Sequence, residues 1–299
     1  MFVIFLYDLF LTNFHGNIYL YADDTAFHYA TESIDDLQRV MQSDLNVLYK
    51  WSILNSLLVN KTKTNYIVFR NLTHEEFRLT YDGTVLERKR VVKYLGLVLN
   101  EHFTWDDHIH KVVQKISPII GMMRRLNWLL PKRVLYILYF SFVHSHLSYL
   151  NPIWNCAPGQ SQNSLLLLQK KALRNIHYLR QSVSVKTYFN SSILPLDYFN
   201  VYQTTTLVFL LKNNLIKHDM SVQMNSDIHE HFTRNSNLLH PTFSRSHFGQ
   251  CAITSRGFRR YNGLPSTLHG INSLPIFKKE LKNHLITQFR DSLDYHTSW

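Results

Sequence analysis

The hydrophobic pattern of this chain changes its period close to Trp105, and this change limits the possible folds more than any other feature. Before it, apolar residues often alternate with polar ones, as they do in half-buried strands. After it, apolar residues recur at helical spacing, as at Ile109, Val112 and Ile116. A strand-rich first part joined to a helical second part is therefore expected.

The first part contains signals for hairpins and for one helix. Asn17–Ala30 alternates on both sides of a central Ala-Asp-Asp-Thr, which predicts two short strands joined by a tight turn. Ser33 is placed to cap an amphipathic helix that ends near Trp51–Asn55. Asp82-Gly83 predicts a second hairpin turn, and Lys93–Leu99 is predicted to be a further strand.

The second part contains signals for several helices. The first should kink or break at Pro118, and the next should begin at Pro131. Ser164 is predicted to cap a third helix, after a loop over Asn151–Asn163. A final helix is predicted over Pro275–Phe289.

Charge is unevenly distributed along the chain. The total is 32 − 21 = +11, yet the first 60 residues hold two basic residues against seven acidic ones, a net of −5. His108–Asn190 contains eleven Lys or Arg residues in 83 positions and no acidic residue. An acidic front before a basic stretch suggests cation-facing chemistry beside a polyanion track. The alternative is a soluble basic protein without any nucleic-acid role.

Composition excludes several classes of protein. With 45% hydrophobic residues, the chain is too apolar to be disordered. Cys156 and Cys251 are too few for a disulfide scaffold, so an intracellular rather than secreted protein is expected. Met1–Phe14 lacks the basic lead-in of a signal peptide, and Val134–Val143 is too short to cross a bilayer, so no membrane partner is expected.

Two adjacent carboxylates, Asp23 and Asp24, stand at the tip of the first predicted hairpin. Neighbouring carboxylates repel each other unless a cation lies beside them. Mg²⁺ binds one or two carboxylates together with waters and substrate phosphates, and two such ions serve phosphoryl transfer. Asp23 is predicted to be the principal ligand and Asp24 the secondary one, because successive side chains on a strand point to opposite faces. The alternative is an exposed turn without a ligand.

Tyr21-Ala22-Asp23-Asp24 between two strands resembles the catalytic hairpin of reverse transcriptases. Further motifs follow in family order and resemble those of non-LTR retrotransposons, in particular jockey-like LINE elements. They are Phe2–Phe10, Trp51 with Leu58, Asn60 and Lys63-Thr64, Lys93–Ile109, Gln169–Arg174, Arg256–Phe258, Asn262–Pro265 and Phe277-Lys278. The departures are Asn100 where Asp is usual, Phe103 where Leu is usual, and Tyr261–Gly263 where Trp-Asn is usual.

The resemblance implies an α+β fold in three parts. Residues 1–105 would form an incomplete, ferredoxin-like polymerase palm with an antiparallel sheet, the catalytic hairpin and the primer grip. Residues 106–190 would form a basic helical thumb, and residues 191–299 a mixed C-terminal region to which no role is assigned.

The resemblance also assigns site residues. Lys63 would lie near the phosphates of the incoming nucleotide, where a lysine neutralises or protonates the departing pyrophosphate; otherwise it is a solvated lysine at a helix end. Tyr94-Leu95-Gly96 would be the primer grip, although a plain strand kink is the alternative. In the thumb, the basic residues would face the template–primer backbone, and about half are expected to be only solvated. These are Arg124, Arg125, Lys132, Arg133, Lys170, Lys171 and Arg174.

The implied function is RNA-directed DNA synthesis by two Mg²⁺ or Mn²⁺ ions, with an RNA template, a DNA primer and dNTP as partners. The family takes a third carboxylate and the fingers from segments upstream of the hairpin, which are not found before Asp23 here. We therefore expect the chain not to extend primers by itself and expect a missing N-terminal polymerase part as a possible partner. The alternative is a non-catalytic nucleic-acid-binding remnant that keeps the basic thumb.

Overall fold

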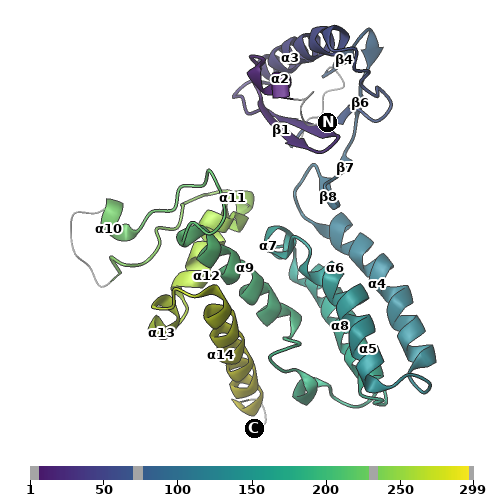
Figure 1. The fold of residues 1–299 in the computed structure, drawn as a ribbon, viewed down its shortest axis with the longest axis vertical. Coiled ribbons are helices and arrows are strands. Elements are labelled where there is room, and N and C mark those ends of the chain that lie inside the picture. Colours follow the sequence, from purple (N-terminus) through teal and green to yellow (C-terminus); the bar gives the residue numbers. More distant parts are fainter. Residues whose placement is uncertain (1–6, 70–76, 229–234, 296–299) are drawn as a thin grey trace. The chain divides into compact units, whose positions relative to one another are not determined.

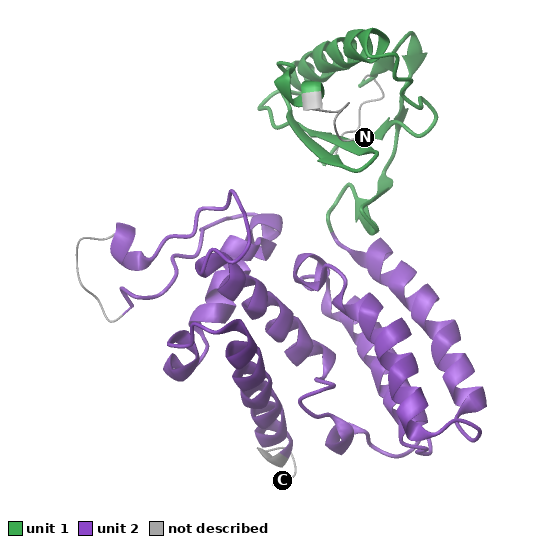
Figure 2. Cartoon of the chain, viewed as in Figure 1, with its two compact units in different colours: residues 1–103 green, residues 104–299 purple. Residues whose placement is uncertain are grey.

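The structure is a computed structural model that describes residues 7–69, 77–228 and 235–295. The chain divides into two compact units, residues 1–103 (unit 1) and residues 104–299 (unit 2), and each is described by itself (Figure 2). Unit 1 combines one long helix with short strands, whereas the described part of unit 2 is dominated by helices (Figure 1). This mixture is compatible with the predicted α+β class, and the palm and thumb assignments stay predictions.

The strands of unit 1 pair two by two. Three pairs are antiparallel hairpins and one pair is parallel. The antiparallel pairs are β1 (Asn17–Tyr21) with β2 (Asp24–His28), β4 (Thr80–Tyr81) with β5 (Thr84–Val85), and β7 (Val91–Tyr94) with β8 (Leu97–Asn100); the parallel pair is β3 (Asn65–Tyr66) with β6 (Glu87–Arg88). The predicted hairpin within Asn17–Ala30 is thereby confirmed.

The core of unit 1 forms around the long helix α3 (Ile34–Leu54), which the short helix α2 (Tyr7–Leu11) precedes. The Ser33 hydroxyl accepts a hydrogen bond from the Asp36 N–H at 3.4 Å, so the predicted N-cap is confirmed. Buried apolar side chains from α2, α3 and the strands pack together. They are Leu9, Leu48, Tyr66, Val68, Phe77, Leu79, Tyr81 and Leu86.

The Lys93–Leu99 segment is not one strand but the hairpin β7–β8. Leu95 and Gly96 form its two-residue turn, with φ of +45° and +82°. Positive φ at both turn positions matches the twist of the flanking strands, and glycine adopts it without steric cost. Asp82-Gly83 makes an equivalent turn with φ of +47° and +68°, as predicted.

Unit 2 is built from helices of very different lengths. The longest are α4 (Asp106–Leu126), α8 (Gly159–Ile176), α9 (Leu196–Lys212) and α14 (Leu274–Tyr295). The shorter ones are α5 (Lys132–Leu138), the π-helix η1 (Tyr139–His144), α6 (Ser145–Ser148), α7 (Asn151–Trp154), η2 (Lys186–Tyr188), α10 (Asn225–Ile228), α11 (His247–Cys251), η3 (Ile253–Gly257), α12 (Phe258–Asn262) and α13 (Ser266–His269).

The apolar stripes of the long helices form the core of unit 2. Helix α4 packs along α8, with α5 also against α8, and α14 packs against α9 (Figure 1). Met123, Leu165 and Val208 are fully buried in these contacts. Helix α4 continues through Pro118, so the predicted kink does not break the helix.

Two predicted boundaries in unit 2 are wrong. Helix α8 begins at Gly159 and not after Ser164, whose hydroxyl instead donates to the Ser161 carbonyl oxygen at 2.7 Å inside the helix. The expected loop over Asn151–Asn163 contains α7 and the first turn of α8. The first error arises because a serine inside a helix can bond to its own preceding turn and so looks like a cap in the sequence, and the second because the prolines and the glycine of this stretch look like loop residues.

Within the described part of the chain, no helix combines the length and the apolar character needed to cross a bilayer.

Candidate catalytic hairpin and nucleic-acid interface

The β1–β2 hairpin presents the paired aspartates at its tip. Tyr21 pairs with Asp24, so Ala22 and Asp23 form the two-residue turn, and Ala22 has a φ of +53°. The side chains of Asp23 and Asp24 are exposed. Exposed carboxylates keep their water shell, so divalent cations and their hydration waters have access to them.

The two faces of this hairpin differ in character. Ile18 and Leu20 are half-buried and pack on the core of unit 1, whereas Tyr19 and Tyr21 are 54% and 64% exposed. Asp24 lies opposite Tyr21 and therefore shares the outer, tyrosine-bearing face. The outer face thus joins one carboxylate of the pair to two exposed aromatic rings.

The turn of the second hairpin, β7–β8, lies near this outer face. Burial raises the pKa of Tyr94, and the negative charge of Asp24 and the neighbouring Tyr19 raise it further. Such an effect requires the Tyr94 hydroxyl to lie near the Asp24 carboxylate. The Tyr94 side chain therefore lies within electrostatic range of Asp24, although the two residues are far apart in the sequence.

Lys63 lies on the surface of unit 1 in a turn that Asn60 organises. The Asn60 side-chain oxygen accepts hydrogen bonds from the N–H groups of Thr62 and Lys63, both at 3.1 Å. The Lys63 side chain is exposed, and within residues 7–69 and 77–103 no hydrogen bond or ion pair links it to Asp23 or Asp24. Its role near a nucleotide stays a prediction.

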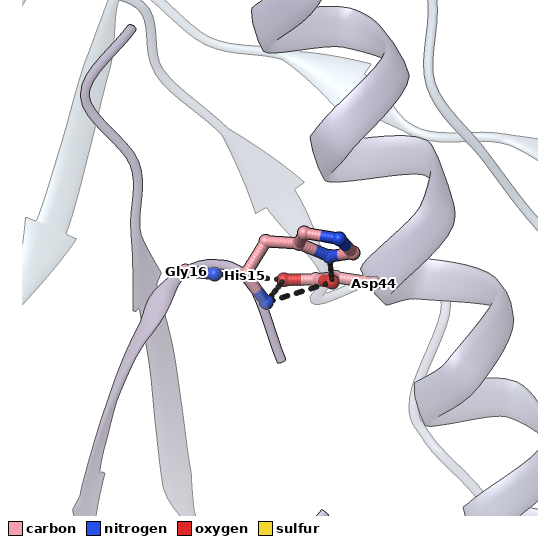
Figure 3. Close-up of polar contacts among 3 residues, drawn as sticks. All are labelled: His15, Gly16 and Asp44. Atoms are coloured by element: carbon pink, nitrogen blue, oxygen red, sulfur yellow. Dashed lines mark hydrogen bonds and ion pairs between the residues drawn. The ribbon is translucent and has the colours of Figure 1, made fainter. Parts of the chain in front are cut away.

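A buried carboxylate that the sequence reasoning did not select, Asp44 of α3, holds the chain at the start of β1 (Figure 3). Asp44 is 1% exposed. It accepts hydrogen bonds from the His15 N–H at 3.0 and 3.1 Å, from the Gly16 N–H at 2.9 Å and from the His15 ring Nδ1 at 2.7 Å. Burial alone would raise the pKa of Asp44, but these bonds and one from Tyr29 outweigh it and lower the pKa.

Gly16 completes this anchor because its lack of a side chain lets the backbone lie close to the Tyr29 ring. A Cβ at Gly16 would lie 2.3 Å from the Tyr29 ring, which is shorter than any real contact. The sequence signal was available, since Asp44 interrupts the apolar stripe of a predicted helix. A lone carboxylate on such a face must find buried donors.

No three metal-binding side chains of His, Cys, Asp or Glu lie together among the residues that the structure describes. The donor chemistry of Asp23 and Asp24 nevertheless fits a hard divalent ion, because Mg²⁺ takes one or two protein carboxylates and fills its remaining positions with water and phosphate oxygens.

Most of the predicted thumb residues lie at one end of the α4–α5–α8 bundle. Tyr178, just after α8, donates a hydrogen bond to the Leu130 carbonyl oxygen at 2.9 Å, and Tyr136 of α5 bonds to His177 at 3.2 Å. The first bond joins the end of α8 to the loop between α4 and α5, and the second joins it to α5 itself. The basic end of the bundle, as we name it, comprises Arg124, Arg125, Lys132, Arg133 and Arg174.

The basic residues differ in exposure. Four of the five at the basic end of the bundle are exposed, while Arg174 is half-buried and donates to the Val183 carbonyl oxygen at 3.2 Å. Lys170 and Lys171 lie about one turn before Arg174 in α8, and so further from this end of the bundle. Lys170 is half-buried and Lys171 is exposed. None of the seven forms an ion pair within the described residues. Lys132 and Arg133 even occupy the first turn of α5, where positive charge opposes the helix dipole.

Two half-buried arginines were assigned no role from the sequence. Arg256 donates to the Asn155 side-chain oxygen and to the Pro152 carbonyl oxygen, the latter at 2.9 Å, and Arg260 donates to the Thr204 hydroxyl at 3.2 Å. Burial lowers the pKa of Arg260 to about 10, helped by the charge of Arg256. Arg256 therefore ties the C-terminal helices to α7, and Arg260 ties them to α9, inside unit 2.

Comparison with known proteins extends these observations. The chain is 27% identical over 164 residues to a probable RNA-directed DNA polymerase from transposon BS of Drosophila melanogaster, which covers 52% of this chain and 18% of that protein. It is 27% identical over 162 residues to the RNA-directed DNA polymerase from the mobile element jockey of the same fly, which covers 52% and 17%.

A third relative is the retrovirus-related Pol polyprotein from the type-1 retrotransposable element R1 of Nasonia vitripennis, 22% identical over 153 residues, which covers 48% of this chain and 45% of that protein. The matched stretch is thus under a fifth of the length of the Drosophila relatives. No protein-family model and no solved structure matches the chain. The resemblance seen in the motifs is confirmed: over about half of its length, this chain is similar to the reverse transcriptases of jockey-like non-LTR mobile elements.

Proposed function

We propose that this chain forms part of the polymerase centre of a mobile-element reverse transcriptase. The observation that carries the proposal is the exposed Asp23-Asp24 pair at a hairpin tip, with Tyr94 of a second hairpin near the Asp24 carboxylate. Relatives named as RNA-directed DNA polymerases support the same reaction, the transfer of a nucleotide from dNTP to a primer 3′-hydroxyl. An RNA template and a DNA primer are the corresponding partners.

In this proposal, Asp23 and Asp24 hold Mg²⁺ or Mn²⁺ at the hairpin tip. When bound, such ions stabilise the attacking and leaving oxygens of the transfer. The Tyr94-Leu95-Gly96 turn positions the primer end beside the carboxylates, since its glycine lets a strand approach the backbone closely. Lys63 neutralises charge on the departing pyrophosphate.

The proposal includes weak or absent synthesis by these residues alone. Two-metal synthesis in the resembled family uses a third carboxylate. Within the described residues, no third metal-binding side chain joins Asp23 and Asp24. Two carboxylates should hold the ions weakly and position them poorly.

The basic end of the bundle favours a second function, which is sequence-independent binding of nucleic acid without synthesis. Four exposed cations stand together there without acidic partners in the described chain. Contacts of this kind neutralise phosphates and release counterions, so affinity falls steeply with salt. Both functions predict such binding, and only Asp23-dependent chemistry separates them.

The test measures Mn²⁺ binding by electron paramagnetic resonance and primer extension in the same preparations. Asp23→Asn and Asp24→Asn are compared with Asp35→Asn, which also changes one member of an exposed Asp pair, in the first turn of α3. We expect Mn²⁺ binding that the first two variants lose and the third keeps, with little synthesis. Binding that Asp23→Asn leaves intact would contradict the metal site, and robust Asp23-dependent synthesis would contradict the proposed weakness.

A further inference from the structure

A cavity of about 230 Å³ opens between α9, α14, the π-helix η1 and the segment before α9. It lies wholly within unit 2. The residues used below from its wall are Lys278, Lys282, His144, Tyr202, Ser192 and Thr206. No carboxylate lines this cavity.

Two lysines of α14 point their charge into this space. Lys278 and Lys282 are four residues apart, so they share one face of the helix, and both are half-buried. Burial lowers the pKa of Lys282, and the charge of Lys278 lowers it further. Like charges at this spacing destabilise a helix, and neither lysine has an ion pair in the described part of the chain. An anion in the cavity would relieve this repulsion.

The remaining wall supplies neutral donors. The Lys282 ammonium lies 5.1 Å from the centre of the Tyr202 ring, which fixes the lysine beside the cavity. Burial lowers the pKa of His144 to about 4, with a contribution from Lys282, so the imidazole is neutral near pH 7.

Thr206 of α9 adds a buried hydroxyl whose hydrogen-bonding capacity the chain itself uses little. It is 7% exposed, and its buried hydroxyl forms no hydrogen bond of normal geometry with the described residues. It does interact weakly with the neighbouring Tyr202: burial raises the pKa of Tyr202, and a hydrogen-bonding interaction with the Thr206 hydroxyl lowers that pKa in part. Buried hydroxyls are rarely left without a partner, so a polar ligand in the cavity would satisfy it.

We propose that this cavity binds a phosphate-type oxyanion, with Lys278 and Lys282 as the cationic contacts and the Thr206, Tyr202 and Ser192 hydroxyls as donors. Ammonium groups and hydroxyls are the donors that phosphate oxygens take in proteins. The oxyanion comes either from a nucleic-acid strand or from free phosphate. The site is separate from Asp23 and Asp24, and its occupation requires no synthesis.

The experiment is calorimetric titration of the whole chain with inorganic phosphate at constant ionic strength, and with a short single-stranded DNA that carries or lacks a 5′-phosphate. The double variant Lys278→Gln/Lys282→Gln is compared with Lys279→Gln, an exposed lysine on the same helix outside the cavity wall. We expect the double variant to bind phosphate about tenfold more weakly or worse and Lys279→Gln to bind normally.

Each outcome decides for or against the site. Lysine-dependent binding of inorganic phosphate identifies free phosphate as a sufficient ligand, and such binding seen only with DNA identifies the strand as its source. Equal binding by wild type and double variant, or no binding of any probe, would overturn the proposal. Thr206→Val keeps the side-chain shape and all charges, so a weaker phosphate affinity in this variant supports the site even if the double variant folds poorly.

Discussion

The two units of the molecule keep their functional residues in place by different means. In unit 1, the hairpin that carries Asp23 and Asp24 belongs to a two-stranded sheet, and such hairpins are marginal unless something else holds them. The buried carboxylate of Asp44 fixes the start of β1 through bonds to His15 and Gly16. In unit 2, long helices bury whole apolar stripes under the basic end of the bundle.

This difference teaches that order at the acidic tip depends on one polar anchor and on a few half-buried side chains such as Ile18 and Leu20, whereas order at the basic surface is distributed over many contacts. A single substitution should therefore loosen the first and leave the second intact. Such separable failure is the sharpest consequence of the comparison, because it assigns the acidic hairpin and the basic surface each its own structural support.

The largest effect is expected from Asp44→Ala. It leaves the part-buried N–H groups of His15 and Gly16 without their carboxylate acceptor, which should cost about 1–3 kcal/mol of unfolding free energy in unit 1. Hydrogen exchange measured by mass spectrometry should show lost protection in β1 and β2 and unchanged protection in α4 and α8. Asp35→Ala removes an exposed carboxylate of the same helix and should change stability by less than about 0.5 kcal/mol. Equal loss in both units would break the comparison.

Acid should act on the two units in different pH windows. His108 of unit 2 is 4% exposed, and burial lowers its pKa from 6.5 to about 4, helped by Lys115 and Lys111. Between these values the unfolded chain binds a proton that the folded chain does not, so stability falls as pH drops from 6.5 to 4. The loss amounts to about 3 kcal/mol at most.

Asp44 follows the opposite rule in unit 1. The pKa of Asp44 is lowered in the folded state. Its contribution to the unfolding free energy of unit 1 is therefore present above the ordinary carboxyl pKa of about 4, and it is lost as the pH falls through the folded pKa. Hydrogen exchange at pH 6.5, 5 and 4 should therefore show α4 opening before β1. A His108→Gln variant should reduce, in unit 2 alone, the loss of stability between pH 6.5 and 4, although His144, whose pKa is also lowered to about 4, keeps part of it. If hydrogen exchange in unit 2 of that variant depended on pH as in the wild type, His108 would not be a source of the acid sensitivity.

Substitutions at the basic end of the bundle should change nucleic-acid binding without changing the stability of unit 2. Trp128, in the loop between α4 and α5, is 76% exposed beside Arg124 and Arg125. An exposed ring among cations is suited to stack on an unpaired base, and its loss should cost about 1–3 kcal/mol of binding to single-stranded DNA. Trp128→Ala is compared with Phe243→Ala, another ring that is 84% exposed, in fluorescence-anisotropy titrations. Equal effects of the two variants would exclude this role.

Arg124→Gln tests the electrostatic part of the same surface. It should lower affinity for all sequences and reduce the slope of log affinity against log salt by about 1. Titrations at several salt concentrations measure the slope. An unchanged slope would mean that this arginine is only solvated.

Which parts of the fold and of the candidate site the sequence predicts depends on how far apart in the chain the interacting residues are. The first hairpin, the Ser33 cap and the Asp82-Gly83 turn follow from chemistry within a few residues, and the structure contains all three. The Lys93–Leu99 segment was predicted as one strand because its residues are mostly apolar, and a leucine gives no sequence signal for the positive φ that Leu95 adopts in the turn. The helix start at Gly159 was missed because Pro158 and Gly159 look like loop residues.

Contacts between distant segments were beyond such reasoning. The bonds of Asp44 to His15 and Gly16 span 28 or 29 positions, and those of Arg256 to Asn155 and Pro152 span more than 100. Periodicity reports which face of a helix is buried but not what it meets. The nearness of Tyr94 to Asp24 also joins distant segments; periodicity does not predict it, and only the resemblance to reverse transcriptases, through the primer-grip assignment, suggested it.

The smallest effect is expected at the tip of the first hairpin, where local backbone strain can be isolated from the Asp44 anchor. Ala22 holds a φ of +53°, which costs an L-residue roughly 1 kcal/mol, whereas glycine adopts it freely. Ala22→Gly should therefore stabilise the hairpin by about 0.5 kcal/mol after the greater entropy of the unfolded glycine is counted. Ala26→Gly, four residues on in β2, has no such strain to relieve and should destabilise the hairpin by about 0.5–1 kcal/mol. Hydrogen exchange of β1 and β2 amides measures both. Opposite signs would show that turn strain limits the acidic tip locally, and a destabilising effect of both variants would show that the φ of Ala22 stores no strain that glycine relieves.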